Sequence, residues 1–208
     1  MKKSYFLLIT LCSLLFAVFL WSCGEGPGSP GSEGSEDTGV EVTITNVTHQ
    51  YLDQDIAWQI DIYPIADCDG NPETIDPELF SDDFAIFDFE GTPLNPNATI
   101  TPGDLHVETY SVEFFAKDPG SPPIERYDGF QRFTIPADGS ITGVQIFIID
   151  AARKIETSNL ITAGIYIPQR MPMQYDMKIT FNGQNDYGED FKEEYLTTVE
   201  MADYDHCE

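Results

Sequence analysis

Positive charge is scarce in this chain of 208 residues, which carries 10 Lys and Arg against 36 Asp and Glu for a formal charge of −26. No Lys or Arg occurs between Ser4 and Ala116, a span that holds 20 acidic residues. Nucleic-acid phosphates and anionic lipid head groups would repel such a chain. We therefore expect no nucleic-acid partner and attribute the acidity to solvation, with divalent cation binding as the alternative.

Long apolar runs are equally few. One stands out, the 17 residues from Tyr5 to Trp21, which follow the positive pair Lys2 and Lys3. A positive start followed by an apolar run of this length is typical of a secretory signal. A membrane-spanning helix needs about 20 apolar residues, so it remains the alternative at the short end of the range.

The run ends in Leu20-Trp21-Ser22-Cys23, which resembles the lipobox of bacterial lipoproteins, although Trp21 stands where a small residue is usual. The resemblance implies cleavage before Cys23 and lipidation of that cysteine with three acyl chains such as palmitate. Each buried methylene contributes about 0.8 kcal/mol, so three chains anchor a protein permanently. The expected location is the bacterial cell envelope, and Gly24 after the cysteine favours the outer membrane.

Residues 24–39 are rich in Gly, Ser, Pro and Glu and contain no large apolar side chain. This composition predicts a flexible linker with a root-mean-square reach of about 20–25 Å. We therefore divide the chain into a signal peptide at 1–22, the lipidated cysteine and linker at 23–39, and one folded domain at 40–208.

Cysteines are also rare, with four in the chain. Cys12 leaves with the signal peptide and Cys23 takes lipid, so Cys68 and Cys207 remain. In an oxidising compartment the two are expected to form a disulfide. The bridge would close a loop of about 140 residues and stabilise the fold by up to about 5 kcal/mol in the chain-entropy model.

Alternation of apolar and polar residues dominates the rest of the sequence. "VEVTIT" at 40–45 and "YDMKITFN" at 175–182 each predict a strand with one face in water. The other predicted strands are 57–65, 83–89, 105–115, 129–135, 141–149 and 191–201, with a shorter one at 161–167. The segment "FNGQNDYGEDF" predicts a hairpin between the last two long strands.

Helical signals are few. Asp76 followed by Pro77 predicts a single helical turn, and residues 150–160 are either a short helix or an excursion between strands. The fold class is therefore all-β, an antiparallel sandwich or barrel. The layout resembles the immunoglobulin-like or fibronectin-like sandwiches of secreted bacterial proteins. Trp58 precedes both remaining cysteines, so the inter-sheet disulfide of antibody domains is not expected.

Acidic side chains gather around both cysteines, in "ADCDGNPE" and "ADYDHCE". The start of the first segment resembles an EF-hand loop, although Pro72 stands where that loop needs Gly. The disulfide would bring together candidate calcium ligands from both segments, and solvated turn residues are the alternative explanation. The candidate ligands are Asp67, Asp69, Asn71 and Asp205. A second, weaker candidate is the hairpin loop with Asn182, Asp186, Glu189 and Asp190.

No catalytic residue can be assigned from the sequence. The three histidines are dispersed, and no nucleophile lies on a strand-to-helix elbow. We expect a membrane-anchored lipoprotein whose acidic sandwich serves as a binding or structural module for an unidentified protein or glycan, with no required cofactor. The alternative is an extracytoplasmic enzyme that acts on carbohydrate or cell-wall material through paired carboxylates.

Overall fold

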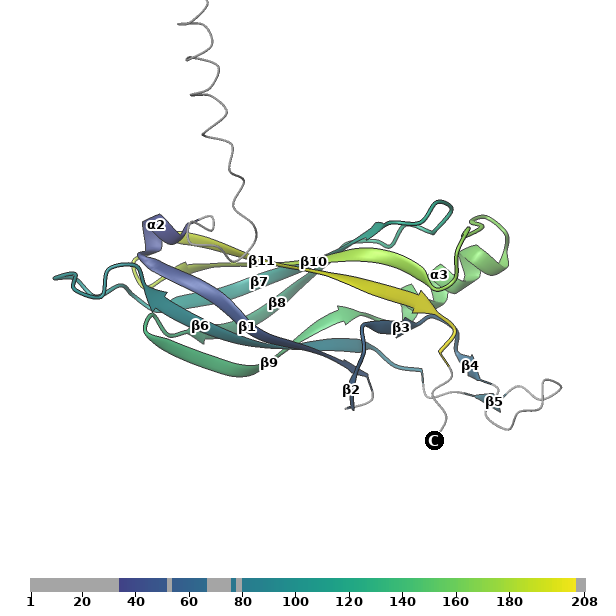
Figure 1. The fold of residues 1–208 in the computed structure, drawn as a ribbon, viewed down its shortest axis with the longest axis horizontal. Helices are drawn as coiled ribbons and strands as arrows, with labels where there is room; N and C mark the ends of the chain where they lie inside the picture. The colour runs from purple at the N-terminus through teal and green to yellow at the C-terminus, as the bar shows by residue number, and fades with distance from the viewer. Residues whose placement is uncertain (1–33, 52–53, 67–75, 78–79, 205–208) are drawn as a thin grey trace, which may run out of the picture.

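The computed structural model of the chain describes residues 34–51, 54–66, 76–77 and 80–204. Most of this part is β-strand, arranged in two curled sheets that face each other (Figure 1). The all-β prediction is therefore confirmed. The first sheet has four strands in the order β2 (Gln54–Ile56), β1 (Val40–Tyr51), β6 (Asp83–Pro93) and β9 (Gly139–Ile149).

The second sheet has five strands, in the order β3 (Gln59–Asp61), β11 (Asp190–Ala202), β10 (Met173–Asn185), β7 (Leu105–Ala116) and β8 (Tyr127–Ile135). Neighbouring strands are antiparallel in both sheets, except that β3 runs parallel to β11. A small ladder joins β4 (Ile65–Ala66) to β5 (Asp76–Pro77).

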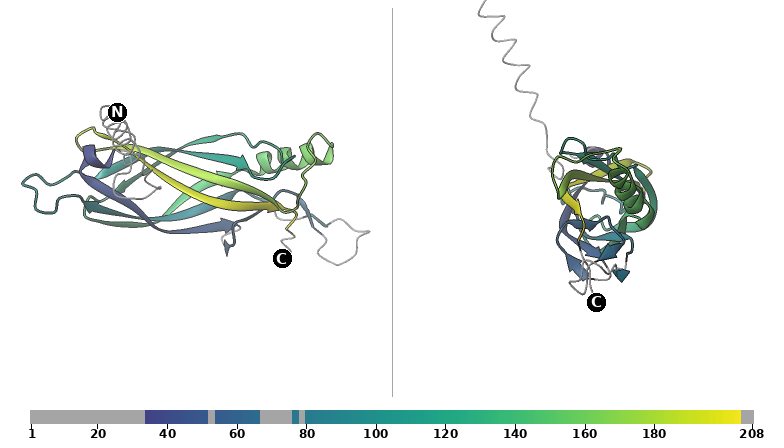
Figure 2. Two further views of the ribbon diagram at one scale, coloured as in Figure 1. Left: turned by 45° about the horizontal axis from the view of Figure 1, so that its top comes forward. Right: turned by 90° about the vertical axis from the view of Figure 1, so that its right-hand side faces the viewer.

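Aromatic side chains fill the space between the sheets. Phe87 and Phe89 of β6 each pack edge-on against Phe181 of β10, with ring centroids 5.1 and 5.2 Å apart. All three are fully buried. Burial of one such side chain contributes about 1.5–3 kcal/mol, so these contacts between facing sheets are a main source of stability. The end-on view shows how the sheets curl around this interior (Figure 2).

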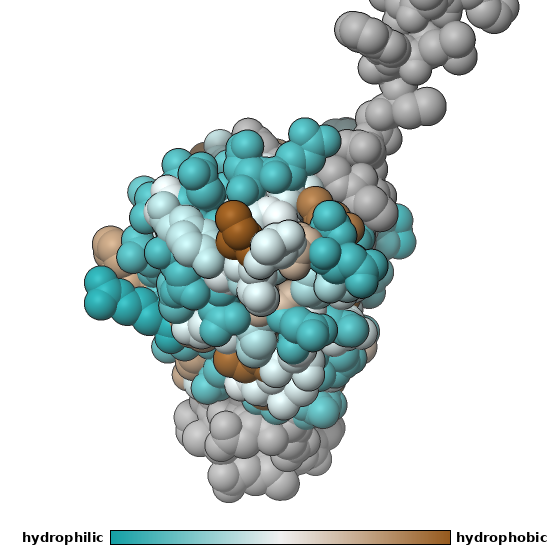
Figure 3. All heavy atoms as spheres, turned by 90° about the vertical axis from the view of Figure 1, so that its left-hand side faces the viewer, coloured by the Kyte–Doolittle hydropathy of each residue, from teal (hydrophilic) through white to brown (hydrophobic). Residues whose placement is uncertain are grey.

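The two helices of the described residues lie at opposite ends of the elongated molecule (Figures 1 and 2). α2 (Ser35–Thr38) is a single turn next to the start of β1. It falls within the segment expected to be a linker, and its Ser35 and Thr38 are buried. α3 (Ala151–Thr162) connects β9 to β10. The α2 end is mostly hydrophilic, with a few apolar side chains among the polar ones (Figure 3).

Seven of the long predicted strands, all except 57–65, are confirmed, most with longer bounds, and so is the β10–β11 hairpin. The strand predicted at 161–167 is wrong, because α3 runs to Thr162 and a turn follows.

The strand predicted at 57–65 is reduced to β3 and the start of β4. Asp76 and Pro77 pair with β4 instead of starting a helical turn. No helix of the described residues is long and apolar enough to cross a membrane.

Candidate binding site

A buried ionic cluster ties α3 to the four-stranded sheet. Lys154 of α3 donates from Nζ to Asp83 Oδ2 at 2.7 Å. The other oxygen of the same carboxylate, Oδ1, lies 2.8 Å from His49 Nε2. The three side chains are at most 1% exposed. α3 is therefore held at a fixed place by groups that solvent does not reach.

His49 and Lys154 make further contacts around this cluster. His49 Nδ1 lies 2.7 Å from the carbonyl oxygen of Ala57, which can only accept, so this nitrogen carries a hydrogen. His49 Nε2 lies 2.8 Å from Asp83 Oδ1, so the ring links Ala57 to the Asp83 carboxylate. The Lys154 ammonium packs over the rings of Tyr51 and Phe80 at 4.6 and 4.4 Å, which stabilises a cation.

A ligand cannot reach the cluster, because its side chains are buried. The cluster acts instead by fixing the position of α3 on the four-stranded sheet. A buried ion pair is weak evidence for stability, but such pairs can restrict an element to one arrangement. α3 buries its polar residues Lys154, Thr157 and Ser158, which lie at i, i+3 and i+4 on one helix face. Of the apolar α3 residues, Ile155 is exposed, Leu160 is half-buried and Ile161 packs against the core.

α3 forms one wall of a groove of about 480 Å³. The β7–β8 loop (117–126) and the α3–β10 loop (163–172) form the rest, joined by a hydrogen bond from Gln169 N to the carbonyl oxygen of Pro119 at 3.2 Å. The lining residues are Pro123, Ile124, Glu125, Arg153, Glu156, Thr157, Leu160, Ile165 and Tyr166. We call this feature the α3 groove.

The loop that follows α3 also carries exposed apolar side chains. Ile165, Ile167 and Met171 are 67%, 74% and 49% exposed on the loop that follows α3. Apolar side chains gathered on a surface in this way mark contact sites for other molecules. The α3 groove is therefore a candidate binding site.

Arg153 is the positive group of the α3 groove. Its guanidinium lies 5.4 Å from the centroid of the Tyr127 ring and forms an ion pair with Asp150. Its Nε is buried and has no hydrogen-bond partner among the described residues. Glu125 and Glu156 lie on the same rim, so the groove offers charges of both signs around an apolar floor.

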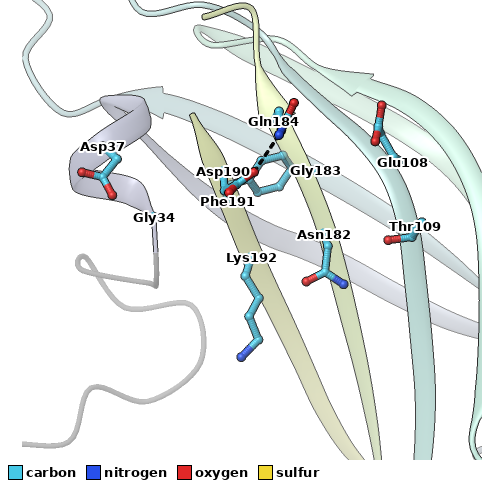
Figure 4. Close-up of a pocket in the computed structure, with 10 residues that line it drawn as sticks. All are labelled: Gly34, Asp37, Glu108, Thr109, Asn182, Gly183, Gln184, Asp190, Phe191 and Lys192. Atoms are coloured by element: carbon cyan, nitrogen blue, oxygen red, sulfur yellow. Dashed lines mark hydrogen bonds between the residues drawn. The ribbon is translucent and has the colours of Figure 1, made fainter. Parts of the chain in front are cut away.

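A second, more polar hollow of about 500 Å³ lies beside α2, on the outer face of the five-stranded sheet (Figure 4). Gln184 donates to Asp190 across it at 2.8 Å. The hollow combines carboxylates, amides, a hydroxyl and an amine, which are the groups that hydrogen-bond sugars. The polar lining residues are Asp37, Glu108, Thr109, Asn182, Gln184, Asp190 and Lys192.

Asp186 and Asp190 of the β10–β11 hairpin have partners other than a metal. Asp186 accepts from His106 Nε2 at 2.7 Å and from the backbone N–H of Asp104 at 3.1 Å. These hydrogen bonds, that of His106 first, lower the pKa of Asp186 below its usual value. Within the described part of the chain, no group of three or more His, Cys, Asp or Glu side chains could hold a metal ion.

The other candidate residues assigned from the sequence lie outside the described part of the chain. They are the lipidation site Cys23, the disulfide pair Cys68 and Cys207, and the calcium candidates Asp67, Asp69, Asn71 and Asp205. Conversely, the sequence did not indicate the cluster of His49, Asp83 and Lys154, because its members are 34 and 71 residues apart. No protein-family model, curated protein or solved structure matches this chain.

Proposed function

We propose that this protein is a lipid-anchored component of the bacterial cell envelope that presents an acidic β-sandwich as a binding module, with the α3 groove as its binding face. One observation carries the binding role: an apolar groove with exposed isoleucines is built on a helix fixed by a buried ionic cluster. Binding residues are commonly found on loops that a rigid scaffold positions, and this arrangement fits that rule.

The position of α2 supports the anchored arrangement. The expected lipid site, Cys23, precedes Gly34 by 11 residues, and a flexible segment of that length has a root-mean-square reach of about 17–20 Å. α2 lies at the end of the body opposite α3 (Figure 1). An anchor attached there leaves the α3 groove open to partners.

Mass spectrometry of the mature N-terminus tests the anchor. The full chain is produced in a bacterium, and the N-terminal peptide is expected to begin at Cys23 with the added mass of three acyl chains. Cys23→Ser is the matched control and should release the protein from the membrane fraction. An intact Met1 on a cytosolic product would contradict the proposal.

The second candidate function is activity on carbohydrate, which the polar hollow beside α2 favours (Figure 4). Glycosidases use two placed carboxylates as acid and base or nucleophile, and Glu108 and Asp190 are the pair to test. Turnover of a glycan panel that Glu108→Gln or Asp190→Asn abolishes would favour this function. Absence of turnover with the unaltered protein would leave the binding role.

Two finer assignments complete the proposal. The facing antiparallel sheets support a sandwich of the immunoglobulin-like kind, and an experimental structure compared strand by strand with that fold would test it. A calcium ion held by Asp67, Asp69, Asn71 and Asp205 is supported by the acidic sequence around the two cysteines.

A further inference from the structure

We propose that the polar hollow beside α2 is one subsite for a neutral glycan chain, and that Phe130 of β8 forms the next subsite by stacking on a sugar ring. The inference rests on the second candidate function, in which carbohydrate is the ligand of this hollow. It adds the class of sugar and a contact residue that does not line the hollow itself. It depends neither on the lipid anchor nor on the α3 groove.

The strand register places Phe130 beside the hollow. Phe130 of β8 pairs with Thr109 of β7. Thr109 pairs with Asn182 of β10, which in turn pairs with Lys192 of β11. Residues directly opposite on antiparallel strands lie on one face of the sheet, with Cβ atoms about 4.5–5.5 Å apart. Thr109, Asn182 and Lys192 line the hollow, so Phe130 is the next side chain in the same row.

This row points away from the core. Tyr110 follows Thr109 and Phe181 precedes Asn182, and both aromatic rings are buried between the sheets. Successive side chains of a strand alternate between the two faces, so Thr109 and Asn182 face outward. Phe130 is 88% exposed. The outer face therefore offers a bare aromatic ring next to a polar cavity.

The hollow is built by irregular strands and by α2. The register of β7 against β8 shifts next to Thr109, and that of β10 against β7 shifts next to Asn182. Such bulges redirect side chains and are over-represented beside active sites. A Cβ at Gly34 would lie 2.6 Å from the carbonyl oxygen of Asp190, so α2 packs closely against β11. The result is a concave site between α2 and two bulged ladders (Figure 4).

The polar side chains of this site are available to a ligand. Within the part of the chain that the structure describes, Glu108, Thr109 and Asn182 have no hydrogen-bond partner for their side chains. A carboxylate accepts hydrogen bonds, whereas a hydroxyl and an amide both donate and accept. A pyranose ring presents C–H groups on its face and hydroxyl groups around its edge. Its face suits the Phe130 ring, and the hydroxyl groups of the next sugar suit the hollow.

Charge selects among glycans. The carboxylates of Asp37, Glu108 and Asp190 line the hollow. The ammonium group of Lys192 lies 2.9 Å from Glu194 Oε1, so its charge is already balanced by a carboxylate outside the hollow. Like charges brought together across an interface cost affinity. Uronic-acid and sulfated chains are therefore disfavoured, and neutral or N-acetylated pyranose chains are the assigned class.

Isothermal titration calorimetry of the full chain in detergent tests the site. Cellohexaose and chitohexaose are the neutral probes, and hexagalacturonate is the acidic probe; binding of a neutral probe alone is expected. Phe130→Ala should weaken this binding about tenfold, and Phe130→Tyr should restore it because the ring is kept. Phe115→Ala is the matched control, since Phe115 is also exposed on this face but lies farther along β7. It should leave binding unchanged.

Three results would overturn the proposal. They are binding of neither neutral probe, preference for the acidic probe, and equal weakening by Phe130→Ala and Phe115→Ala. Circular dichroism melting checks that each variant is folded, and Asn182→Ala, which removes an amide from the hollow, should weaken binding independently of Phe130. Failure of the catalytic candidate is distinguishable. Binding without turnover overturns catalysis alone, whereas glycan turnover that Phe130→Ala leaves unchanged overturns the stacking subsite alone.

Discussion

Lys154 Nζ lies 2.7 Å from Asp83 Oδ2, and neither side chain is more than 1% exposed. Removing one partner of such a buried pair leaves the other charge without compensation and typically costs about 3–5 kcal/mol. We therefore expect Lys154→Ala to lower the free energy of unfolding by about that amount. Urea unfolding followed by circular dichroism measures it.

The matched control for this prediction is Lys178→Ala. Lys178 pairs with Glu113 at 3.1 Å on the sheet surface, where its side chain is 29% exposed. Pairs near the surface contribute about 0–1 kcal/mol. If both variants lose the same free energy of unfolding, the buried pair contributes no more to stability than a surface pair.

Glu193 makes stability depend on pH. Burial raises its pKa to about 7, and the charges of Glu194 and Glu41 add to the effect. A carboxyl whose pKa is higher in the folded state binds more protons there, so stability falls as pH rises from about 4.5 to about 7 and then levels off. Glu193→Gln should match the unaltered protein near pH 4 and exceed it at pH 8, by on the order of 3 kcal/mol.

Melting temperatures at those two pH values check this prediction. Asp176→Asn is the control, because the hydrogen bond from Lys117 lowers the pKa of Asp176. Its carboxylate stabilises the fold above its usual pKa and loses that effect as pH falls. The control should therefore be less stable than the unaltered protein at pH 8. A Glu193→Gln variant without an advantage at pH 8 would contradict the burial effect.

His106 and Asp186 tie the start of β7 to the β10–β11 turn. The pKa of Asp186 is lowered, so its contribution is present above the usual Asp pKa and is lost as pH falls below it. We expect Asp186→Asn to melt at a lower temperature than the unaltered protein at pH 6, with the difference vanishing near pH 2. If the difference in melting temperature stays constant from pH 6 to pH 2, the loss of stability comes from packing and not from the Asp186 charge.

The predicted Cys68–Cys207 bridge has a direct chemical test. Peptide mapping without reductant should recover the two cysteines in one linked fragment. Reduction should lower stability by up to about 5 kcal/mol, since the bridge closes a loop of about 140 residues. Free thiols at both positions in the exported protein would end this assignment.

The calcium assignment predicts a ligand-dependent melting temperature. Calcium in the millimolar range should raise the melting temperature by binding the folded state, and a chelator should reverse the increase. Asp69→Asn together with Asp205→Asn should remove the response. A melting temperature that neither calcium nor chelator changes would contradict the proposed calcium site.

The strands could be predicted wherever one sheet face is apolar, as in β10, where Tyr175, Met177 and Ile179 are buried. The bounds of β1 and the helix α3 could not be predicted, because polar side chains there point into the interior of the protein. His49 is buried in the second half of β1, so the alternation is broken there and the predicted strand stops early. α3 buries the polar residues Lys154, Thr157 and Ser158, so it lacks the apolar stripe that identifies a helix, and it could not be told from an irregular excursion.

The candidate groove depends on the same polar contacts. It exists because α3 is fixed against β6, and that contact joins Lys154 to a residue 71 positions earlier. Local periodicity carries no information about a pair so distant. The exposed isoleucines after α3 even favoured a strand at 161–167, since β-branched residues are typical of strands.

β3 pairs in parallel with β11, which places Gln59 beside Glu200. These two residues lie near the beginning and the end of the domain's sequence. The five-stranded sheet is therefore incomplete until almost the whole polypeptide is present. Contacts of such long sequence separation slow folding. A shortened product that stops before residue 190, where β11 begins, would leave both β3 and β10 with open edges, which are the places where unfinished sheets aggregate.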